Sequence, residues 1–299
     1  MLDLDWQFTL VLITNGVMIG LMYTLIALGF VLVYKATDAI NFAQGEFVMF
    51  AGFIAAAGAY LADLPFIVCA LLAIAGMVAF AFGLERVVLR PLIGRPVVAV
   101  IMATIGVAAL LRGFATLVFG AGTRAVVMPV SDEPLFFGPI MLPPVELVGA
   151  GVSLVFLAAF TWFFLRSRMG IAMRAVADSQ QVAMAMGINV QRYFALAWAM
   201  AGIVSALGGV VWGSMIGVDN QLALVGLKVF PVVILGGLDS VVGAVVGGLV
   251  VGVVENLAAG YLDPYVGGGT KDFAPYILMI IALMIRPYGL FGRWRIERV

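Results

Sequence analysis

The stretch RSRMGIAMRAVADSQQVAMAMGINVQR, Arg166–Arg192, is the one long basic and polar segment of the chain. Apolar runs of about 20 residues precede and follow it, and a helix of that length crosses a hydrocarbon core of about 30 Å. We therefore expect this segment to be a loop at one membrane face, held there by the helices on either side of it.

The composition of the whole chain agrees with a membrane protein. Hydrophobic residues make up 64% of the 299 residues, charged residues only 11%, and the mean hydropathy is +1.18. Soluble domains have about 45–50% apolar and about 25% charged residues. Alternating ten-residue strands, which are typical of membrane β-barrels, are absent. The sequence therefore predicts an all-α, polytopic membrane protein.

The apolar runs predict about nine transmembrane segments, eight to nine in all, because the seventh is short enough to be partly re-entrant. Their expected bounds are Phe8–Tyr34, Phe47–Tyr60, Pro65–Leu84, Val97–Phe119, Val145–Leu165, Tyr193–Ile216, Leu224–Leu235, Val241–Gly260 and Phe273–Ile285. The Pro- and Gly-rich stretch Gly120–Pro144 has no sustained period, which predicts an irregular loop on the face opposite the basic segment.

The distribution of Lys and Arg predicts that the N-terminus is outside and the C-terminus inside. In that orientation the inner loops hold twelve of the sixteen basic residues, and only Arg124 and Lys271 lie outside. The twelve are Lys35, Arg86, Arg90, Arg95, Arg166, Arg168, Arg174, Arg192, Arg286, Arg293, Arg295 and Arg298.

We expect a single transmembrane domain over residues 1–299. It comprises a first helix group (1–119), an external loop (120–144), the basic inner loop (166–192) and a second helix group (193–299). Segments one to four and six to nine run in opposite directions, and each group has a polar break near its first pair. This arrangement is compatible with an inverted repeat built from broken helices, although any nine-segment chain can be divided in the same way.

Within the basic loop, Asp178-Ser-Gln-Gln181 has the form of a capping box, and Gly187 suits a left-handed residue after a last helical turn. A two-turn helix is therefore predicted between Asp178 and Gly187. Its apolar face is expected to hold Val182, Ala183 and Met186, between Arg174 and Arg192. A helix this short needs a docking surface, which is either a separate partner or the inner surface of the chain itself.

Two polar breaks interrupt apolar runs. In the first, Asp38 or Asn41 is expected to cap a helix that carries Glu46 in its first turns. Polar backbone within a membrane is tolerated where it is buried in protein or lines a water-filled path. The breaks are therefore either parts of a transport path or ordinary helix starts. The residues concerned are Asn41, Gln44 and Glu46 in the first break and Gly236 and Gly237 in the second.

A few ionisable residues fall in or near the apolar runs. Arg112 and Glu255 lie well inside predicted spans, so we expect them to pair or to face a polar interior, whereas Glu85 is expected to snorkel from a helix end. Cys69 can form no intrachain disulfide and is expected to pack.

No catalytic chemistry is indicated. The chain has no histidine, no phosphate loop of the form GxxxxGK[ST] and no Cys/His metal set. We therefore predict that it is not an enzyme and holds no cofactor. If energy drives transport, it comes from an ion gradient or from another subunit.

Four ordered blocks resemble the LivH-type permeases of branched-chain amino acid ABC importers. They are IGLMYTLIALGFVLVYKATDAINFAQGEFVMFAGF (Ile19–Phe53), GIAMRAVADSQQVAMAMGINVQR (Gly170–Arg192), FPVVILGGLDSVVGAVVGGLVVGVVE (Phe230–Glu255) and RPYGLFG (Arg286–Gly292). The resemblance covers most of the chain and is weaker over Gly120–Pro144. Many relatives have His at the position of Gln44, so this departure leaves the exact substrate open.

The resemblance implies a multi-pass permease of the bacterial inner membrane that works by alternating access. Its implied partners are a second, LivM-like permease or a second copy of this chain, two ATP-binding subunits that hold ATP and Mg²⁺, and a periplasmic solute-binding protein. No nucleic-acid partner is implied. The coupling helix to the ATPase would then include Arg174, Ala175, Asp178, Val182, Ala183, Met186 and Gly187, and the translocation path Asn41, Gln44, Glu46, Gly236 and Gly237.

Alternatives remain open from the sequence. Within the same family the substrate could be urea, a short amide or an aromatic acid. From another class, an ion-coupled secondary transporter or a channel would need no ATPase. A membrane subunit without any path would tolerate substitutions at Asn41 or Gln44.

Overall fold

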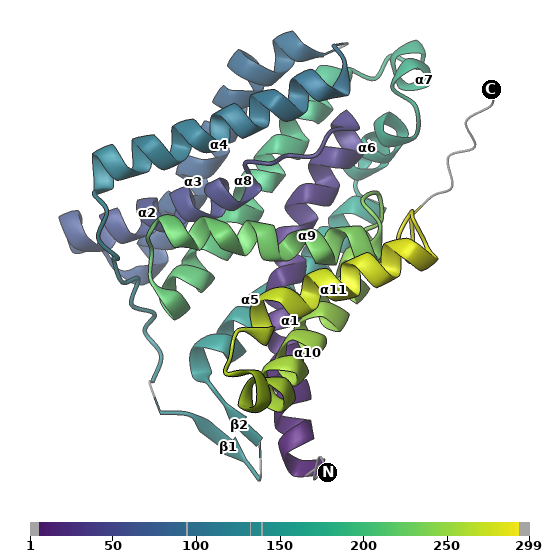
Figure 1. Ribbon diagram of the computed structural model, residues 1–299. Coiled ribbons are helices and arrows are strands. Elements are labelled where there is room, and N and C mark those ends of the chain that lie inside the picture. The colour runs from purple at the N-terminus through teal and green to yellow at the C-terminus, as the bar shows by residue number, and fades with distance from the viewer. Residues whose placement is uncertain (1–5, 94, 132, 139, 293–299) are drawn as a thin grey trace. The chain divides into compact units, whose positions relative to one another are not determined.

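The structure, a computed structural model, describes residues 6–93, 95–131, 133–138 and 140–292. Helices dominate this part of the chain, and one short hairpin is the only sheet in it (Figure 1). The α-helices are α1 (Trp6–Thr37), α2 (Gln44–Ala62), α3 (Phe66–Leu84), α4 (Val97–Phe119), α5 (Pro144–Arg166), α6 (Arg168–Asp178), α7 (Gln180–Ala185), α8 (Val190–Ile216), α9 (Leu224–Gly236), α10 (Val241–Val266) and α11 (Thr270–Ile285).

Seven of the described helices are long and apolar enough to cross a membrane: α1, α2, α3 with its extension to Leu92, α4, α5, α8 and α10. This confirms an all-α, polytopic membrane protein. Two of the nine predicted segments correspond to shorter helices, since α9 has 13 residues and α11 has 16. The basic residues Arg293, Arg295 and Arg298, used for the predicted orientation, lie outside the described residues.

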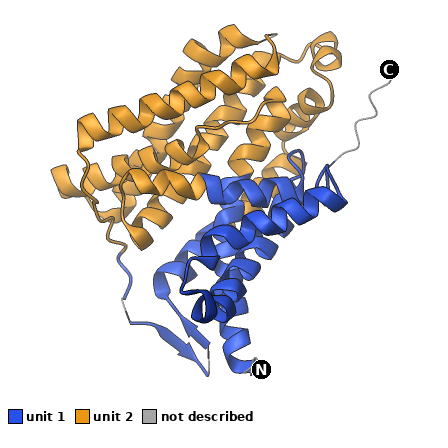
Figure 2. Cartoon of the chain, in the orientation of Figure 1, with its two compact units in different colours: residues 1–27, 129–153, 227–299 blue, residues 28–128, 154–226 orange. Residues whose placement is uncertain are grey.

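The chain forms two compact units, which Figure 2 colours separately. Unit 1 comprises residues 1–27, 129–153 and 227–299, and unit 2 comprises residues 28–128 and 154–226. Each unit is discontinuous in sequence and takes segments from both predicted helix groups.

In unit 2, α8 packs against both α2 and α3. Small residues allow this close approach, because a Cβ added at Gly202 would lie 2.7 Å from the carbonyl oxygen of Met77 in α3. At Gly209 an added Cβ would lie 2.8 Å from the backbone nitrogen of Gly52 in α2. Helices in a membrane associate through such small residues, since lipid provides no hydrophobic drive for their contact.

In unit 1, the first part of α1 packs on α10 by the same means. A Cβ added at Gly16 would lie 2.7 Å from the Cα of Val253, and one added at Gly20 would lie 2.6 Å from the carbonyl oxygen of Gly248. Gly residues therefore allow close helix contacts in both units, between α8 and its neighbours in unit 2 and between α1 and α10 in unit 1.

Two predicted loops contain regular structure. The stretch Gly120–Pro144 is not wholly irregular, because Leu135–Phe137 (β1) pairs antiparallel with Ile140–Leu142 (β2). The predicted inner loop that holds Arg86, Arg90 and Arg95 begins with one π-helical turn, Glu85–Leu89, and one 3₁₀ turn, Arg90–Leu92. Short-range backbone hydrogen bonds form the hairpin and the two turns. Such bonds do not require a hydrophobic period in the sequence, so the pattern of apolar residues did not indicate them.

Candidate functional site

The basic segment folds as two short helices, α6 and α7, whereas only one two-turn helix, between Asp178 and Gly187, was predicted in it. Ser167 caps α6 by accepting a hydrogen bond from the backbone N–H of Gly170 at 2.9 Å. Gly170, Met173 and Val176 form the buried stripe of α6. Their spacing of three residues and the Ser before them are the signals that identify α6 in the sequence.

Ser179 separates the two helices and corrects the predicted capping box. Its backbone is extended, and its hydroxyl accepts from the N–H of Val182 at 3.3 Å. Asp178 is instead the last residue of α6, because the N–H of Ser179 still donates to the carbonyl of Ala175. A residue inside a helix cannot cap the next one, since a cap requires non-helical backbone.

The predicted end of α7 is confirmed. Gly187 has a φ of +79°, in the left-handed region. Its N–H donates to the carbonyl of Met184, and the N–H of Ile188 donates to the carbonyl of Ala183, each at 3.0 Å. These two bonds form a Schellman motif, which satisfies the last carbonyls of the helix.

The apolar side chains of α7 divide between two faces. Ala183 is 2% exposed and points into the protein, so it does not belong to the exposed face predicted from sequence. Val182, Met184 and Met186 are 62%, 56% and 77% exposed. We call these three residues the α7 patch. Three large exposed apolar side chains within the five residues Val182–Met186 are typical of a surface that another protein covers.

Arg174 holds α6 against the end of α5. Its guanidinium lies 5.8 Å from the ring centre of Phe164, and Nη2 donates to the carbonyl of Leu165 at 3.2 Å. Lys35 lies over the same Phe164 ring, at 5.5 Å. Two cations on one aromatic ring fix α6 relative to α1 and α5 within unit 2. Ala175 is half-buried on α6 and Asp178 is exposed.

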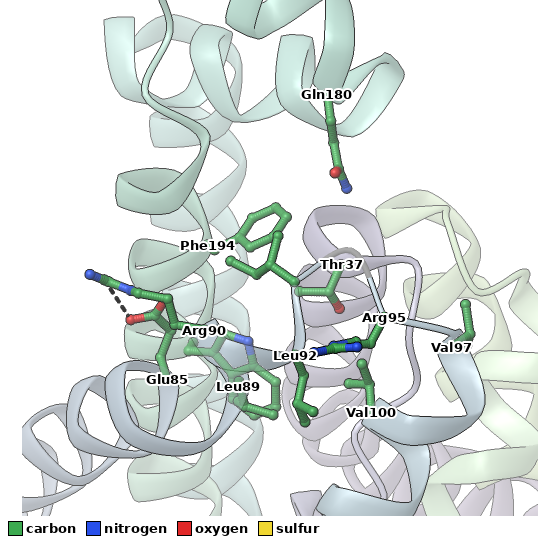
Figure 3. Close-up of a pocket in the computed structure, with 12 residues that line it drawn as sticks. Thr37, Glu85, Leu89, Arg90, Leu92, Arg95, Val97, Val100, Gln180 and Phe194 are labelled. Carbon is green, nitrogen blue, oxygen red and sulfur yellow. Dashed lines mark hydrogen bonds and ion pairs between the residues drawn. The ribbon is translucent and has the colours of Figure 1, made fainter.

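An open pocket lies beside α7, between it and the turns that follow α3 (Figure 3). Gln180 enters the pocket from α7 and donates to the backbone carbonyl of Ala36 at 3.3 Å. On the other side, the Arg90 guanidinium is paired with Glu85 at 2.8 Å. The remaining lining residues are Thr37, Leu89, Leu92, Ile93, Arg95, Val97, Val100, Phe194 and Trp198. Glu85 is 1% exposed, so the prediction that it snorkels is wrong.

The first polar break is buried and fully bonded within unit 2. Asn41 and Gln44 are 0% exposed. The Asn41 amide donates to Oε1 of Gln44 at 3.1 Å, and Nε2 of Gln44 donates to the hydroxyl of Ser205 in α8 at 3.0 Å. Ser205, which sequence alone did not identify, in turn donates to the carbonyl of Ala201. This network joins the start of α2 to the middle of α8.

The predicted helix cap at this break is not formed. The residue before α2 is Ala43, and no side chain caps the helix. Asn41 instead accepts from the N–H of Ala43 through Oδ1, and Asp38 has a φ of +55°. Asn41 therefore shapes the turn before α2 rather than its first turn.

Glu46 lies in the first turn of α2, as predicted, and forms an ion pair with Arg112 of α4. Nε of Arg112 donates to Oε1 of Glu46 at 2.7 Å, and an Nη group contacts the same oxygen. This confirms the expectation that Arg112 is paired within its span.

The second ionisable residue of the spans, Glu255, is also paired. Within unit 1 the Tyr23 hydroxyl donates to its Oε1 at 3.1 Å, and Nζ of Lys228 lies 3.5 Å from the same atom. Lys228 also contacts Asp272 at 2.7 Å. A buried carboxylate with two partners agrees with the expectation for charges in membrane segments.

Gly236 and Gly237 are buried, and the following C-terminal segment closes the break that they form. Leu290 and Phe291 donate their backbone N–H groups to the carbonyls of Leu235 and Gly236, at 2.8 and 3.0 Å. Gly237 has a φ of +104°, and Ser240 caps α10. These bonds satisfy the carbonyl end of α9.

No group of three or more His, Cys, Asp or Glu side chains suited to a metal lies in the part of the chain that the structure describes.

Comparisons with known proteins place the chain in one family. Residues 12–283 match the family model "Branched-chain amino acid transport system / permease component". The chain is 33% identical to the high-affinity branched-chain amino acid transport system permease protein LivH of Salmonella typhimurium, over 95% of this chain and 96% of that protein. It is 31% identical to the corresponding BraD of Pseudomonas aeruginosa, over 96% and 97% of the two chains.

A solved structure shares the fold. A chain of PsaBC from Streptococcus pneumoniae, in complex with Fab, aligns with a TM-score of 0.50 at 13% identity, over 93% of each chain. The match of the family model, the near-complete coverage of the relatives and the seven apolar helices together decide the assignment. This multi-pass membrane protein belongs to the family of branched-chain amino acid transport permeases.

Proposed function

We propose that the chain is the permease subunit of an ATP-driven ABC importer for branched-chain or related hydrophobic amino acids. In this proposal it lies in a bacterial inner membrane with its N-terminus outside and its C-terminus inside, and α9 and α11 complete nine segments. A second permease copy or homologue, two ATP-binding subunits with ATP and Mg²⁺, and a periplasmic binding protein complete the transporter. The permease names of the relatives support the class of transporter.

The observation that carries the proposal is the α7 patch. A six-residue helix is too short to be stable alone, yet both of its ends are capped and its large apolar side chains are exposed. A helix fixed in this way serves to present a surface to a partner. We assign that partner as the ATP-binding subunit, and α6–α7 as the coupling segment that transmits its closure.

The pocket beside α7 supports a moving role for this segment. α7 packs mainly on α6 and α8, while the pocket separates it from the turns after α3. A displacement of α7 can therefore be transmitted through α6 to α5 and α1, by way of Arg174 and Lys35 on Phe164. In alternating access, this displacement would exchange the inner and outer gates, and Asn41, Gln44, Glu46, Gly236 and Gly237 would lie near the path.

The test is reconstitution of the complete transporter in proteoliposomes. Uptake of labelled leucine is expected only when ATP is present on the side of the ATP-binding subunits and the binding protein is present on the opposite side. Vanadate is expected to abolish this uptake. A variant of the ATPase that lacks its phosphate-loop Lys is the matched control. Uptake driven by an ion gradient and insensitive to vanadate would refute the proposal in favour of a secondary transporter. Urea, a short amide and phenylalanine are assayed in parallel to define the substrate class.

A further inference from the structure

The ion pair of Arg112 and Glu46 is unequally buried. The Glu46 side chain is 4% exposed, whereas that of Arg112 is 48% exposed. Arg112 lies seven residues before the end of α4, which is about 10 Å along the helix axis. It is therefore a half-exposed charge well inside an apolar span.

A charge in this place does not face lipid. Ionisable residues inside membrane helices face a protein interior or a water-filled cavity, because the hydrocarbon solvates them poorly. The exposed half of Arg112 therefore marks a side of α4 that water or a polar ligand occupies.

Further polar side chains continue from Arg112 toward the end of α4. Thr116, one turn beyond Arg112, accepts a hydrogen bond from the Asn220 amide at 2.9 Å. Beyond the helix end, the Thr123 hydroxyl lies 2.9 Å from Oδ2 of Asp219. All of these bonds are exposed and belong to unit 2. We call Arg112, Thr116, Asn220, Thr123 and Asp219 the α4 polar strip.

The neighbouring side of α4 differs sharply in character. Leu110, Phe114 and Leu117 are also exposed, and the helical period places them away from Arg112 and Thr116. They form a surface suited to lipid or to a second permease. The exposed surface of α4 is thus apolar on the side of Leu110, Phe114 and Leu117, and on the side of Arg112 it is polar from Arg112 to the end of the helix.

We propose that the α4 polar strip is the outer half of the substrate path and that Arg112 and Glu46 bind the charged end of an α-amino acid. This assignment rests on the proposed importer function and names the substrate chemistry at one site. It adds Arg112, Thr116 and Asn220 to the path residues.

The free hydrogen-bonding groups of the pair match a zwitterion. A guanidinium has five N–H donors, and both contacts with Glu46 use Oε1. The remaining donors on the exposed side of Arg112 can bind a substrate carboxylate in a charge-assisted pair. Oε2 of Glu46, which accepts no bond from the described residues, can accept from the substrate ammonium. Ile105 and Ala109 continue this side of α4 with apolar groups that suit an aliphatic side chain.

Adjacent cysteine substitutions test the water-filled path without breaking the ion pair. Ala109→Cys and Leu110→Cys are made in the complete transporter, in a Cys69→Ala background, and treated from outside with a cationic methanethiosulfonate. Both positions are exposed at nearly the same depth, but only Ala109 lies on the side of Arg112. We expect at least tenfold faster modification of the Ala109→Cys variant, because the reaction requires a thiolate in water. Equal rates at the two positions would overturn the proposal.

Protection by substrate then tests the binding site. Leucine at saturating concentration is expected to slow modification of the Ala109→Cys variant, and leucinol, which lacks the carboxylate, is not. Protection by neither compound, or by both equally, would refute carboxylate binding at Arg112.

Transport kinetics give the independent check. Arg112→Lys is expected to retain uptake, and Arg112→Gln to raise the half-saturating leucine concentration about tenfold or more. Unchanged half-saturation in the Gln variant would count against the site. ATP-driven uptake by the parent transporter is measured on the same vesicles, so failure of the importer function is seen separately from failure of this site.

Discussion

Replacing Met186 by Ser isolates the contribution of the α7 patch to partner binding. Met186 is 77% exposed and lies at the end of α7, so the substitution removes apolar surface without disturbing packed neighbours. Complete burial of a Met side chain contributes about 1.5–3 kcal/mol. If the ATP-binding subunit covers the exposed part, the loss is about 1.2–2.3 kcal/mol, which corresponds to an affinity weaker by about 7- to 45-fold.

The assay is titration of the purified ATP-binding subunit onto the permease in nanodiscs, followed by measurement of ATPase stimulation. Met186→Leu is the conservative control and is expected to bind like the parent, because it keeps the apolar area. Met141→Ser is the positional control, since Met141 is 45% exposed on β2, in the loop predicted to be external. Equal affinities of Met186→Ser and the parent would refute the assignment of the α7 patch. A loss of the same size in Met141→Ser would show that the effect is not specific to α7.

Three further substitutions test other parts of the structure. Gly187→Val is expected to destabilise the end of α7 by about 1–2 kcal/mol, because φ is +79° there, and to uncouple ATP hydrolysis from uptake while membrane insertion persists. Gly187→Asn, which tolerates that φ, should retain coupling. Normal coupled uptake by the Val variant would contradict this prediction. Gly209→Ala is expected to lower the thermal unfolding temperature in detergent, because the added Cβ would meet the backbone of α2. Gly113→Ala, with open space around it, should not lower this temperature. Equal changes of unfolding temperature in the two variants would refute the close packing at Gly209. Lys228→Met is expected to destabilise the fold by about 2 kcal/mol, because it leaves Glu255 buried without its cation. Adding Glu255→Gln should restore much of this loss, which urea or thermal unfolding measures. No recovery in the double variant would show that the two residues are not coupled.

The class of structure and most helix bounds are predictable from local sequence patterns. Runs of apolar residues long enough to cross a bilayer are local signals, so α3, α4 and α8 begin and end within a few residues of their predicted limits. Gly187 was predictable for the same reason, because a left-handed residue after a helical turn is a local requirement. That Arg112 and Glu255 each have a partner of opposite charge was predictable from the cost of placing a charge in hydrocarbon.

Which residues satisfy these requirements depends on the packing of segments that are distant in sequence. Glu46 and Arg112 are 66 positions apart, and Gln44 and Ser205 are 161 apart, so no local pattern identifies either partner. Asp178 was a plausible cap from its neighbours, but α6 continues through it because Met173 and Val176 are buried and Arg174 lies on Phe164. The local sequence indicates that a charge needs a partner or that a helix needs a cap. The packing of distant segments determines which group is that partner or cap.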